Sequence, residues 1–293
     1  MTTRIPRLIT LGETMVLVTP AHAEPLADAA DVRLEIGGAE SNVAMHATAL
    51  GVPTAWISAV GDEALGRRLL RTVAAAGVDT RWVRRDPTAP TGVYFKDPGR
   101  GVLYYRRGSA ASRLTPESVG GIPLEEAEIV HISGITPALS DTCAALIDVV
   151  VERVTAGPGI LSFDVNHRAA LWGPDAAAPA VLALARRADL VFVGLDEAAA
   201  LFGCESAAAV RQLLPQPATV VVKDGAIGAT EFSNGGTTFV PAIPTEVVEA
   251  VGAGDAFAAG YLAALLAGQR AADRLRGGHE RAHLVLQSTS DLG

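Results

Sequence analysis

Short apolar segments alternate with alanine-rich segments of helical length along most of this chain. The apolar segments have the length of buried strands and lie at Leu8–Leu11, Thr54–Val60, Ile129–Ile132, Ile160–Val165, Leu190–Val193 and Thr219–Val222. The segments of helical composition are 41–50, 63–76, 140–154, 176–187, 196–202, 206–214, 256–267 and 271–286. Strands and helices in this rhythm favour an α/β fold whose mainly parallel sheet is flanked by helices on both faces. Such a sheet binds ligands beyond the carboxyl ends of its strands, so the segments that follow the strands are the places to look for chemistry.

Two stretches, 13–36 and 90–108, break this rhythm. Their alternating residues indicate short strands at Met15–Thr19, Val32–Ile36, Gly92–Lys96 and Val102–Arg106. The turn from Asp97 to Gly101 contains Pro98 and Gly99, which suit a hairpin connection. We expect these pieces to form a small β-sheet lid inserted in a single α/β domain that spans 1–293. The alternative is that they are edge hairpins with no covering role.

The composition excludes several classes of function. A net charge of −8 argues against a general nucleic-acid binder. No apolar run reaches the roughly 18 residues that cross a membrane, and the first residues lack the long apolar region of a signal peptide. Cys143 and Cys204 are far apart, which fits neither a disulfide framework nor a metal site. We therefore expect a cytoplasmic globular protein with no nucleic-acid or membrane partner.

The segment Gly252-Ala253-Gly254-Asp255 leads directly into an apolar helix. Its small residues leave room for backbone N–H groups at a helix start to face an anion. Asp255 places a carboxylate beside the same helix end. An anion cradle with an adjacent base is what phosphoryl transfer to an alcohol requires. The alternative is a glycine-rich connection followed by an ordinary first-turn acid.

A second glycine turn, Gly37-Gly38-Ala39, leaves a predicted lid strand and enters a helix. Its glycines permit the close approach of a ligand to the backbone, and Asn42 carries an amide that can bond hydroxyl groups. The alternative is a turn in which Asn42 or Ser41 caps the helix.

Together, the early Gly-Gly-x-x-x-Asn turn and the late Gly-Ala-Gly-Asp turn resemble the two signatures of ribokinase-like (PfkB) sugar kinases. Further segments are similar to those of the 2-keto-3-deoxygluconate kinases in this family: Gly37–Glu40, Tyr104–Ala110, Ser133–Ser140 and Asp164–Arg168. The resemblance covers essentially the whole chain in the expected order. It implies an ATP-dependent kinase that phosphorylates the 6-hydroxyl of 2-keto-3-deoxygluconate and uses Mg²⁺.

The resemblance also implies roles for individual residues. Asp255 would be the base that takes the proton of the sugar hydroxyl, and Gly252, Ala253 and Gly254 would form the anion hole for the transferred phosphoryl group. The acid substrate needs a cation, and guanidinium groups grip carboxylates through paired hydrogen bonds. Residues expected to bind the substrate are Gly37, Gly38, Ala39, Asn42, Tyr94, Tyr104, Arg106, Arg168 and Asp291. Alternatives are a solvated strand for Arg106, lid packing for the tyrosines and a terminal acid for Asp291.

Nucleotide contacts are expected from the loop after the strand Thr219–Val222, which is not a Walker loop. By resemblance, the residues that bind the cofactor are Asn166, Lys223, Gly225, Gly228 and His279. Glu197 would hold hydrated Mg²⁺ through water, since Mg²⁺ keeps much of its water shell. The alternatives are a ligand-free hairpin turn for this loop, a helix-surface position for His279 and a helix-start acid for Glu197.

Two departures from the family pattern affect metal binding. The usual Asp-Thr before the late turn is Glu249-Ala250 here, and the Asn of the Asn-x-x-Glu element is Gly194. A monovalent-cation site and the magnesium water network would therefore differ from those of relatives.

Rival functions are a kinase for fructose, ribose or a related neutral sugar, and a non-catalytic sugar-binding sensor. A homo-oligomer, a dimer or larger, is expected by resemblance.

Overall fold

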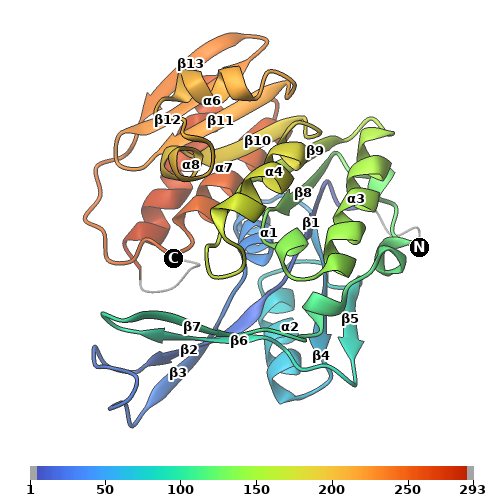
Figure 1. Ribbon diagram of the computed structural model, residues 1–293, viewed down its shortest axis with the longest axis vertical. Coiled ribbons are helices and arrows are strands. Elements are labelled where there is room, and N and C mark those ends of the chain that lie inside the picture. The colour runs from blue at the N-terminus through green and yellow to red at the C-terminus, as the bar shows by residue number, and fades with distance from the viewer. Residues whose placement is uncertain (1–4, 289–293) are drawn as a thin grey trace.

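The computed structural model describes residues 5–288, which form a nine-stranded sheet and a separate four-stranded sheet (Figure 1). The order of the large sheet is β13-β12-β11-β10-β9-β8-β1-β4-β5. Its strands are β1 (Leu8–Leu11), β4 (Thr54–Gly61), β5 (Val83–Asp86), β8 (Ile129–Ser133), β9 (Ile160–Asp164), β10 (Leu190–Gly194), β11 (Thr219–Asp224), β12 (Gly228–Ser233) and β13 (Gly236–Pro241). The strands β11, β10, β9, β8, β1, β4 and β5, which are neighbours in this order, pair in parallel. β12 and β13 add two antiparallel strands at one edge.

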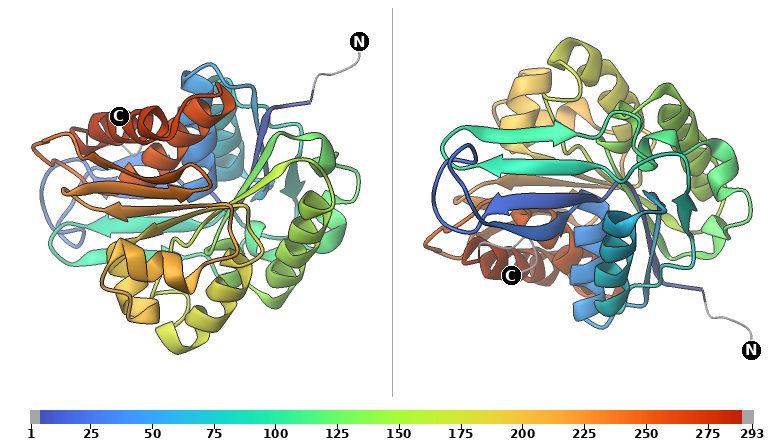
Figure 2. Two further views of the ribbon diagram at one scale, coloured as in Figure 1. Left: turned by 90° about the horizontal axis from the view of Figure 1, so that it is seen from above. Right: turned by 90° about the horizontal axis from the view of Figure 1, so that it is seen from below.

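Helices cover both faces of this sheet, as the two views of Figure 2 show. They are α1 (Ala39–Ala49), α2 (Ala64–Ala75), α3 (Asp141–Thr155), α4 (Pro174–Ala185), α5 (Leu195–Phe202), α6 (Ala207–Leu213), α7 (Ala253–Leu266) and α8 (Ala271–Leu286). The described residues also contain four 3₁₀ turns: η1 (Ala111–Arg113), η2 (Pro116–Val119), η3 (Leu124–Glu126) and η4 (Thr136–Ala138). The mainly parallel sheet with helices on both faces is confirmed.

The side chains of each central strand alternate between two cores, because successive residues of a strand point to opposite faces. In β10, Val191 and Val193 join the core beneath α3 and α4, whereas Leu190 and Phe192 join the core beneath α1, α7 and α8. Both faces are therefore apolar, which is why these strands read as continuous hydrophobic runs in the sequence.

The smaller sheet, which we call the lid sheet, has the order β3-β2-β6-β7. Its strands are β2 (Met15–Pro20), β3 (Val32–Gly37), β6 (Val93–Asp97) and β7 (Gly101–Tyr105). Strands β6 and β7 form a hairpin across the expected turn. The lid sheet extends from the end of the large sheet where α1 begins (Figure 1). The small second sheet expected from the alternating segments is confirmed.

Three strands were not predicted from the sequence. β5 has the sequence Val-Arg-Arg-Asp and carries no apolar run, since it is an edge strand. β12 and β13 form a hairpin beyond β11, where the sequence suggested only a turn.

No helix within residues 5–288 is long and apolar enough to cross a membrane.

Candidate active site

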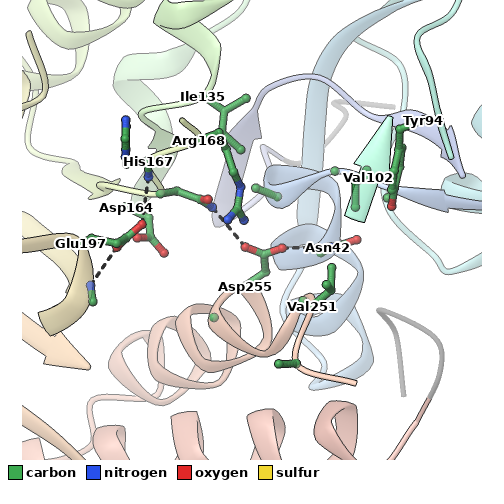
Figure 3. A pocket seen from close by; sticks show the side chains of 18 of the residues that line it. Asn42, Tyr94, Val102, Ile135, Asp164, His167, Arg168, Glu197, Val251 and Asp255 are labelled. Carbon is green, nitrogen blue, oxygen red and sulfur yellow. Dashed lines mark hydrogen bonds between the residues drawn. The ribbon is translucent and has the colours of Figure 1, made fainter. Parts of the chain in front are cut away.

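A cavity of about 620 Å³ lies between the lid sheet and the carboxyl ends of strands in the large sheet (Figure 3). The lid contributes Tyr94, Lys96, Tyr104 and Arg106, among others. The large sheet and its following segments contribute Asp164, Asn166, Arg168, Gly194, Glu197, Lys223 and Gly225. The two glycine turns supply Gly37, Gly38, Ala39, Asn42, Gly252, Gly254 and Asp255. The structure therefore brings residues from both ends of the sequence to one cavity.

The late glycine turn forms the start of α7. Gly252 is the N-cap residue with φ 84°, a left-handed conformation that glycine adopts without strain. α7 begins at Ala253, three residues earlier than the sequence suggested, so Gly254 and Asp255 belong to its first turn. Among residues 5–288, no carbonyl accepts from the backbone N–H of Gly254 or Asp255. These donors and the positive end of the helix dipole are available to an anion.

Asp255 lies in the floor of the cavity with 8% of its surface exposed. The amide Nδ2 of Asn42 donates to its Oδ2 at 3.0 Å, and Nδ2 of Asn166 lies 3.4 Å from its Oδ1 (Figure 3). Burial raises the pKa of Asp255 to about 7, while the Asn42 hydrogen bond and the charge of Arg168 act in the opposite direction. A base with a pKa near neutrality suits general-base catalysis at physiological pH.

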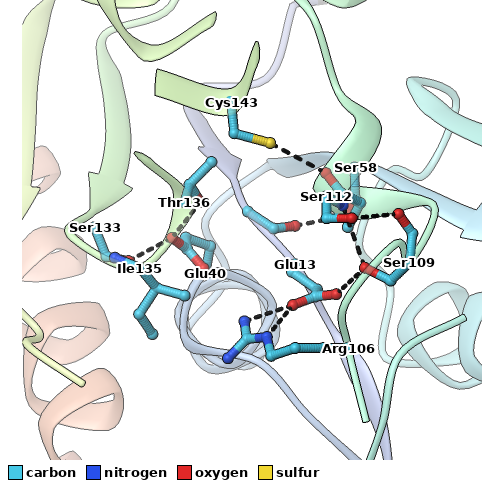
Figure 4. A network of polar contacts seen from close by, with 12 residues as sticks. Glu13, Glu40, Ser58, Arg106, Ser109, Ser112, Ser133, Ile135, Thr136 and Cys143 are labelled. Atoms are coloured by element: carbon cyan, nitrogen blue, oxygen red, sulfur yellow. Dashed lines mark hydrogen bonds and ion pairs between the residues drawn. The ribbon is translucent and has the colours of Figure 1, made fainter. Parts of the chain in front are cut away.

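Arg106 is engaged by a second acid, Glu13, which follows β1. The Glu13 side chain is fully buried, and its Oε2 accepts from Nε of Arg106 at 2.7 Å and lies 2.5 Å from Nη2 (Figure 4). The hydroxyl of Ser109 donates to the other carboxylate oxygen of Glu13 at 2.5 Å. Both Arg106 and Arg168 were expected to bind the substrate carboxylate, but Glu13 already balances the charge of Arg106.

Arg168 has a different environment. Among residues 5–288, no hydrogen bond or ion pair engages its guanidinium group, which lies near Asp255 (Figure 3). On the lid, the rings of Tyr94 and Tyr104 are stacked with centroids 5.8 Å apart, and the Arg106 guanidinium lies 5.7 Å from the Tyr104 ring. The two stacked tyrosines line the same cavity as both arginines.

Lys223, expected to contact the nucleotide, is bound to Asp164. Its Nζ lies 3.0 Å and 3.3 Å from the two carboxylate oxygens of Asp164. Burial would lower the pKa of Lys223, but Asp164 and Glu197 outweigh this effect and raise it, so the amine stays charged. Gly225 lines the cavity, whereas Gly228 pairs with Asp224 at the start of β12 and does not line it.

The structure does not bring His279 into the cavity. Its ring is buried in α8, packs edge-on against Phe257 at 5.1 Å, and its Nε2 lies 3.1 Å from the carbonyl of Val240. Burial lowers the pKa of His279, which favours the neutral ring. The periodicity of the helix did not show that this face packs against α7 and β13. Asp291, the remaining expected substrate contact, lies outside the described residues.

Glu197 is held by backbone donors at the start of α5. Its Oε2 accepts from the N–H of Gly194 and its Oε1 from the N–H of His167, both at 2.9 Å (Figure 3). Burial raises the pKa of Glu197. Each carboxylate oxygen retains a lone pair, so this oxygen donor still fits a water molecule of hydrated Mg²⁺. The described residues contain no group of three or more metal-binding side chains, so a metal ion here would depend on nucleotide phosphates and water.

Two acids that line the cavity and a third, fully buried acid were not among the site residues expected from the sequence. Glu13 and Asp164 lie at or just after the carboxyl ends of β1 and β9, so the rule that places ligands at these ends could have found them. Glu40 gave no such signal. It is fully buried in the first turn of α1, where Ser133 donates to its Oε1 at 2.6 Å (Figure 4).

A parallel sheet covered on both faces, a β lid, and a glycine turn beside a buried carboxylate define the ribokinase-like class of sugar kinases. The chain belongs to the pfkB family of carbohydrate kinases, whose sequence model matches residues 6–292. It is therefore an ATP-dependent sugar kinase, and the family implies ATP and Mg²⁺ as cofactors.

Similar proteins include sugar-acid kinases. The chain is 36% identical over 280 residues to the 2-dehydro-3-deoxygluconokinase of Thermoproteus tenax, covering 89% of this chain and 82% of that one. It is 33% identical over 297 residues to the 2-dehydro-3-deoxygalactonokinase of Haloferax volcanii, covering 97% and 92%. The crystal structure of a PfkB protein from Polaromonas sp. JS666 superposes with a TM-score of 0.91 at 33% identity, covering 98% of each chain.

Proposed function

We propose that this kinase transfers the γ-phosphoryl group of ATP to the 6-hydroxyl of 2-keto-3-deoxygluconate. The observation that carries the proposal is that Asp255, Gly252, Gly254, Arg106 and Arg168 line one cavity. A sugar acid bound in this cavity can meet both a base and cationic side chains. The names of the relatives from Thermoproteus tenax and Haloferax volcanii support a substrate of this class.

Asp255 would accept the proton of the 6-hydroxyl while the hydroxyl oxygen attacks the γ-phosphorus and ADP leaves. Both of its oxygens are already oriented by amides, which leaves their other lone pairs for the proton. The N–H groups of Gly254 and Asp255 would stabilise negative charge on the transferred phosphoryl oxygens. Bound Mg²⁺ would neutralise charge on the phosphates, with Glu197 holding it through water. The lid sheet would exclude water from the reaction.

Recognition of the substrate carboxylate would rest mainly on Arg168. Its guanidinium has no carboxylate partner within the described residues, whereas Arg106 keeps only Nη1 free of Glu13. Asn42 adds a buried Oδ1 without a hydrogen-bond partner among those residues, which can accept from a sugar hydroxyl. Tyr94 and Tyr104 would cover the sugar from the lid.

A second candidate substrate is a neutral sugar such as fructose or ribose. The observation that favours it is the Glu13–Arg106 ion pair, which cancels one of the two positive charges expected for an acid. The fructokinase of Klebsiella pneumoniae, 32% identical over 243 residues, shows that the similarity extends to neutral-sugar kinases.

A coupled assay of ADP release separates the candidates. The panel contains 2-keto-3-deoxygluconate, its galactonate epimer, fructose and ribose, each with ATP and Mg²⁺. We expect the sugar acids to have the highest kcat/KM and the Asp255→Asn control to lose turnover. Arg168→Ala should lower kcat/KM for the acids more than for the neutral sugars. Turnover of neutral sugars that equals or exceeds that of the acids would refute the sugar-acid assignment.

A further inference from the structure

The turn after β9 contains a residue in an unfavourable backbone conformation. Asn166 has φ 37°, and within residues 5–288 every other residue with a positive φ is a glycine. Asparagine tolerates the left-handed region better than most residues, but the conformation still has an energetic cost. Such residues persist where the surrounding structure fixes them, and they concentrate at functional sites.

The backbone on both sides of Asn166 is fixed by hydrogen bonds. The N–H of Val165 donates to the carbonyl of Phe192 at 3.0 Å, which extends the pairing with β10. The N–H of His167 donates to Oε1 of Glu197 at 2.9 Å, while Oε2 of the same carboxylate holds the N–H of Gly194. Glu197 therefore ties the residue after Asn166 to the start of α5, while β10 holds the residue before it.

This fixed turn presents two side chains to the base. Asn166 directs its amide at Oδ1 of Asp255. Arg168, two residues later, lies near the same carboxylate (Figure 3). On the opposite side, Asn42 from α1 donates to Oδ2. The carboxylate is thus held between amides from two separate elements, with its plane defined by both.

We infer that Asn166 and Glu197 are positioning residues for catalysis: Glu197 fixes the 165–168 turn, and Asn166 orients Asp255 toward the sugar hydroxyl. This inference rests on the proposed role of Asp255 as the base. It gives Asn166 a role beside the base rather than at the nucleotide. It also gives Glu197 a role that does not need a metal ion.

Asn166→Gly removes the amide and relieves the backbone strain, so the protein should fold as well as the wild type. The Asn166 amide and Oδ1 of Asp255 are 3.4 Å apart, which is long for a hydrogen bond, so its loss should have a moderate effect on turnover. We therefore expect kcat to fall roughly tenfold, with KM for ATP and for the sugar nearly unchanged. A rise in KM for ATP at constant kcat would overturn the inference and favour nucleotide binding by Asn166.

Asn166→Asp replaces the donor with a carboxylate beside Asp255, which is also faced by Asp164, Lys223 and Arg168. We expect the acidic limb of the kcat/KM profile to move to higher pH by on the order of one unit. Asn234→Asp is the matched control, because Asn234 is exposed in the turn between β12 and β13. An unshifted limb in Asn166→Asp would contradict the inference.

Glu197→Gln tests the inferred role of Glu197 in fixing the 165–168 turn. If Glu197 acts through the turn, adding Asn166→Gly to Glu197→Gln should reduce kcat by much less than Asn166→Gly does alone. Independent, multiplicative effects on kcat would overturn the positioning role of Glu197, as would a change confined to the Mg²⁺ requirement.

A readout without turnover separates this inference from the proposed function. At about pH 8, Asn166→Asp should lower Tm more in the presence of Asp255 than in the Asp255→Asn background, because like charges then face each other. Equal decreases in Tm would refute the contact between the two side chains. An inactive wild type that still shows this coupling would refute the proposed substrate while supporting the contact.

Discussion

Replacing Glu40 with glutamine removes an ionisable group from the first turn of α1. The carboxyl is fully buried, its Oε1 accepts from Ser133 and Thr136, and its Oε2 has no hydrogen-bond partner among the described residues. Burial raises the pKa of Glu40 from 4.5 to about 7. Glutamine has nearly the same shape and keeps an oxygen for both hydroxyl donors.

The direction in which stability changes with pH follows from the linkage between protonation and folding. The protonated form of Glu40 is favoured in the folded state, so its contribution to stability is complete below pH 4.5 and is lost as pH rises through about 7. A shift from 4.5 to about 7 is about 2.5 units, and 1.36 kcal/mol per unit gives about 3 kcal/mol. As the pH rises through this range, the free energy of unfolding of the wild type should therefore fall by about 3 kcal/mol more than that of Glu40→Gln.

Urea unfolding of both proteins at about pH 5 and about pH 8 measures this difference. Asp255 and His131 also titrate with shifted pKa values, but both are present in the two proteins, so their contributions cancel in the comparison. We expect the stability of Glu40→Gln relative to wild type to increase between these two pH values by about 2–3 kcal/mol. Parallel pH dependence of the two proteins would refute the buried, protonated carboxyl.

Three further predictions follow from the same structure. Because Asp255 must be ionised to accept a proton and its pKa is about 7, kcat/KM should rise with pH and level off above neutrality; a flat profile across this range would exclude it as the base. In Gly134→Ala, the added Cβ would lie 2.2 Å from the carbonyl oxygen of Val165, so we expect displacement of the 165–168 turn, a lower Tm and a lower kcat; wild-type kinetics would contradict this. Tyr261→Phe removes the hydroxyl that donates to buried Glu231 at 2.8 Å, so chemical denaturation should show a loss of about 1.5–3 kcal/mol, and an unchanged free energy of unfolding would disprove the contribution of that bond.

Local patterns predicted the parts of the fold that depend on local physics. The apolar run 190–193 became β10 because both of its faces are buried, and the alternating run 92–96 became β6 because the lid sheet has two different faces. Edge elements were harder, since Val83-Arg-Arg-Asp has no apolar periodicity and forms β5 only by pairing with β4.

The pairings within the site could not be predicted, because they join residues that are distant in the sequence. Asn42 and Asp255 are 213 positions apart, and Arg106 and Glu13 are 93 positions apart. The motifs identified Asp255 and Arg106 but carried no information about which partner each would meet. A paired arginine and a free arginine look the same in a sequence, although they differ greatly in their attraction for an anion.

The difference between a paired and an unpaired arginine bears on which class of substrate the cavity binds. Of the lysine and arginine side chains that line the cavity within residues 5–288, Lys96, Arg106 and Lys223 each pair with a carboxylate, whereas Arg168 pairs with none. The uncompensated charge therefore lies beside Asp255, where it favours the ionised base. A substrate carboxylate bound to Arg168 would share that charge and raise the pKa of Asp255, but a neutral sugar would not. A sugar-acid kinase should thus show an acidic limb at higher pH in kcat, which reports the complex, than in kcat/KM, which reports the free enzyme. Coincident limbs would mean that Arg168 serves the base alone.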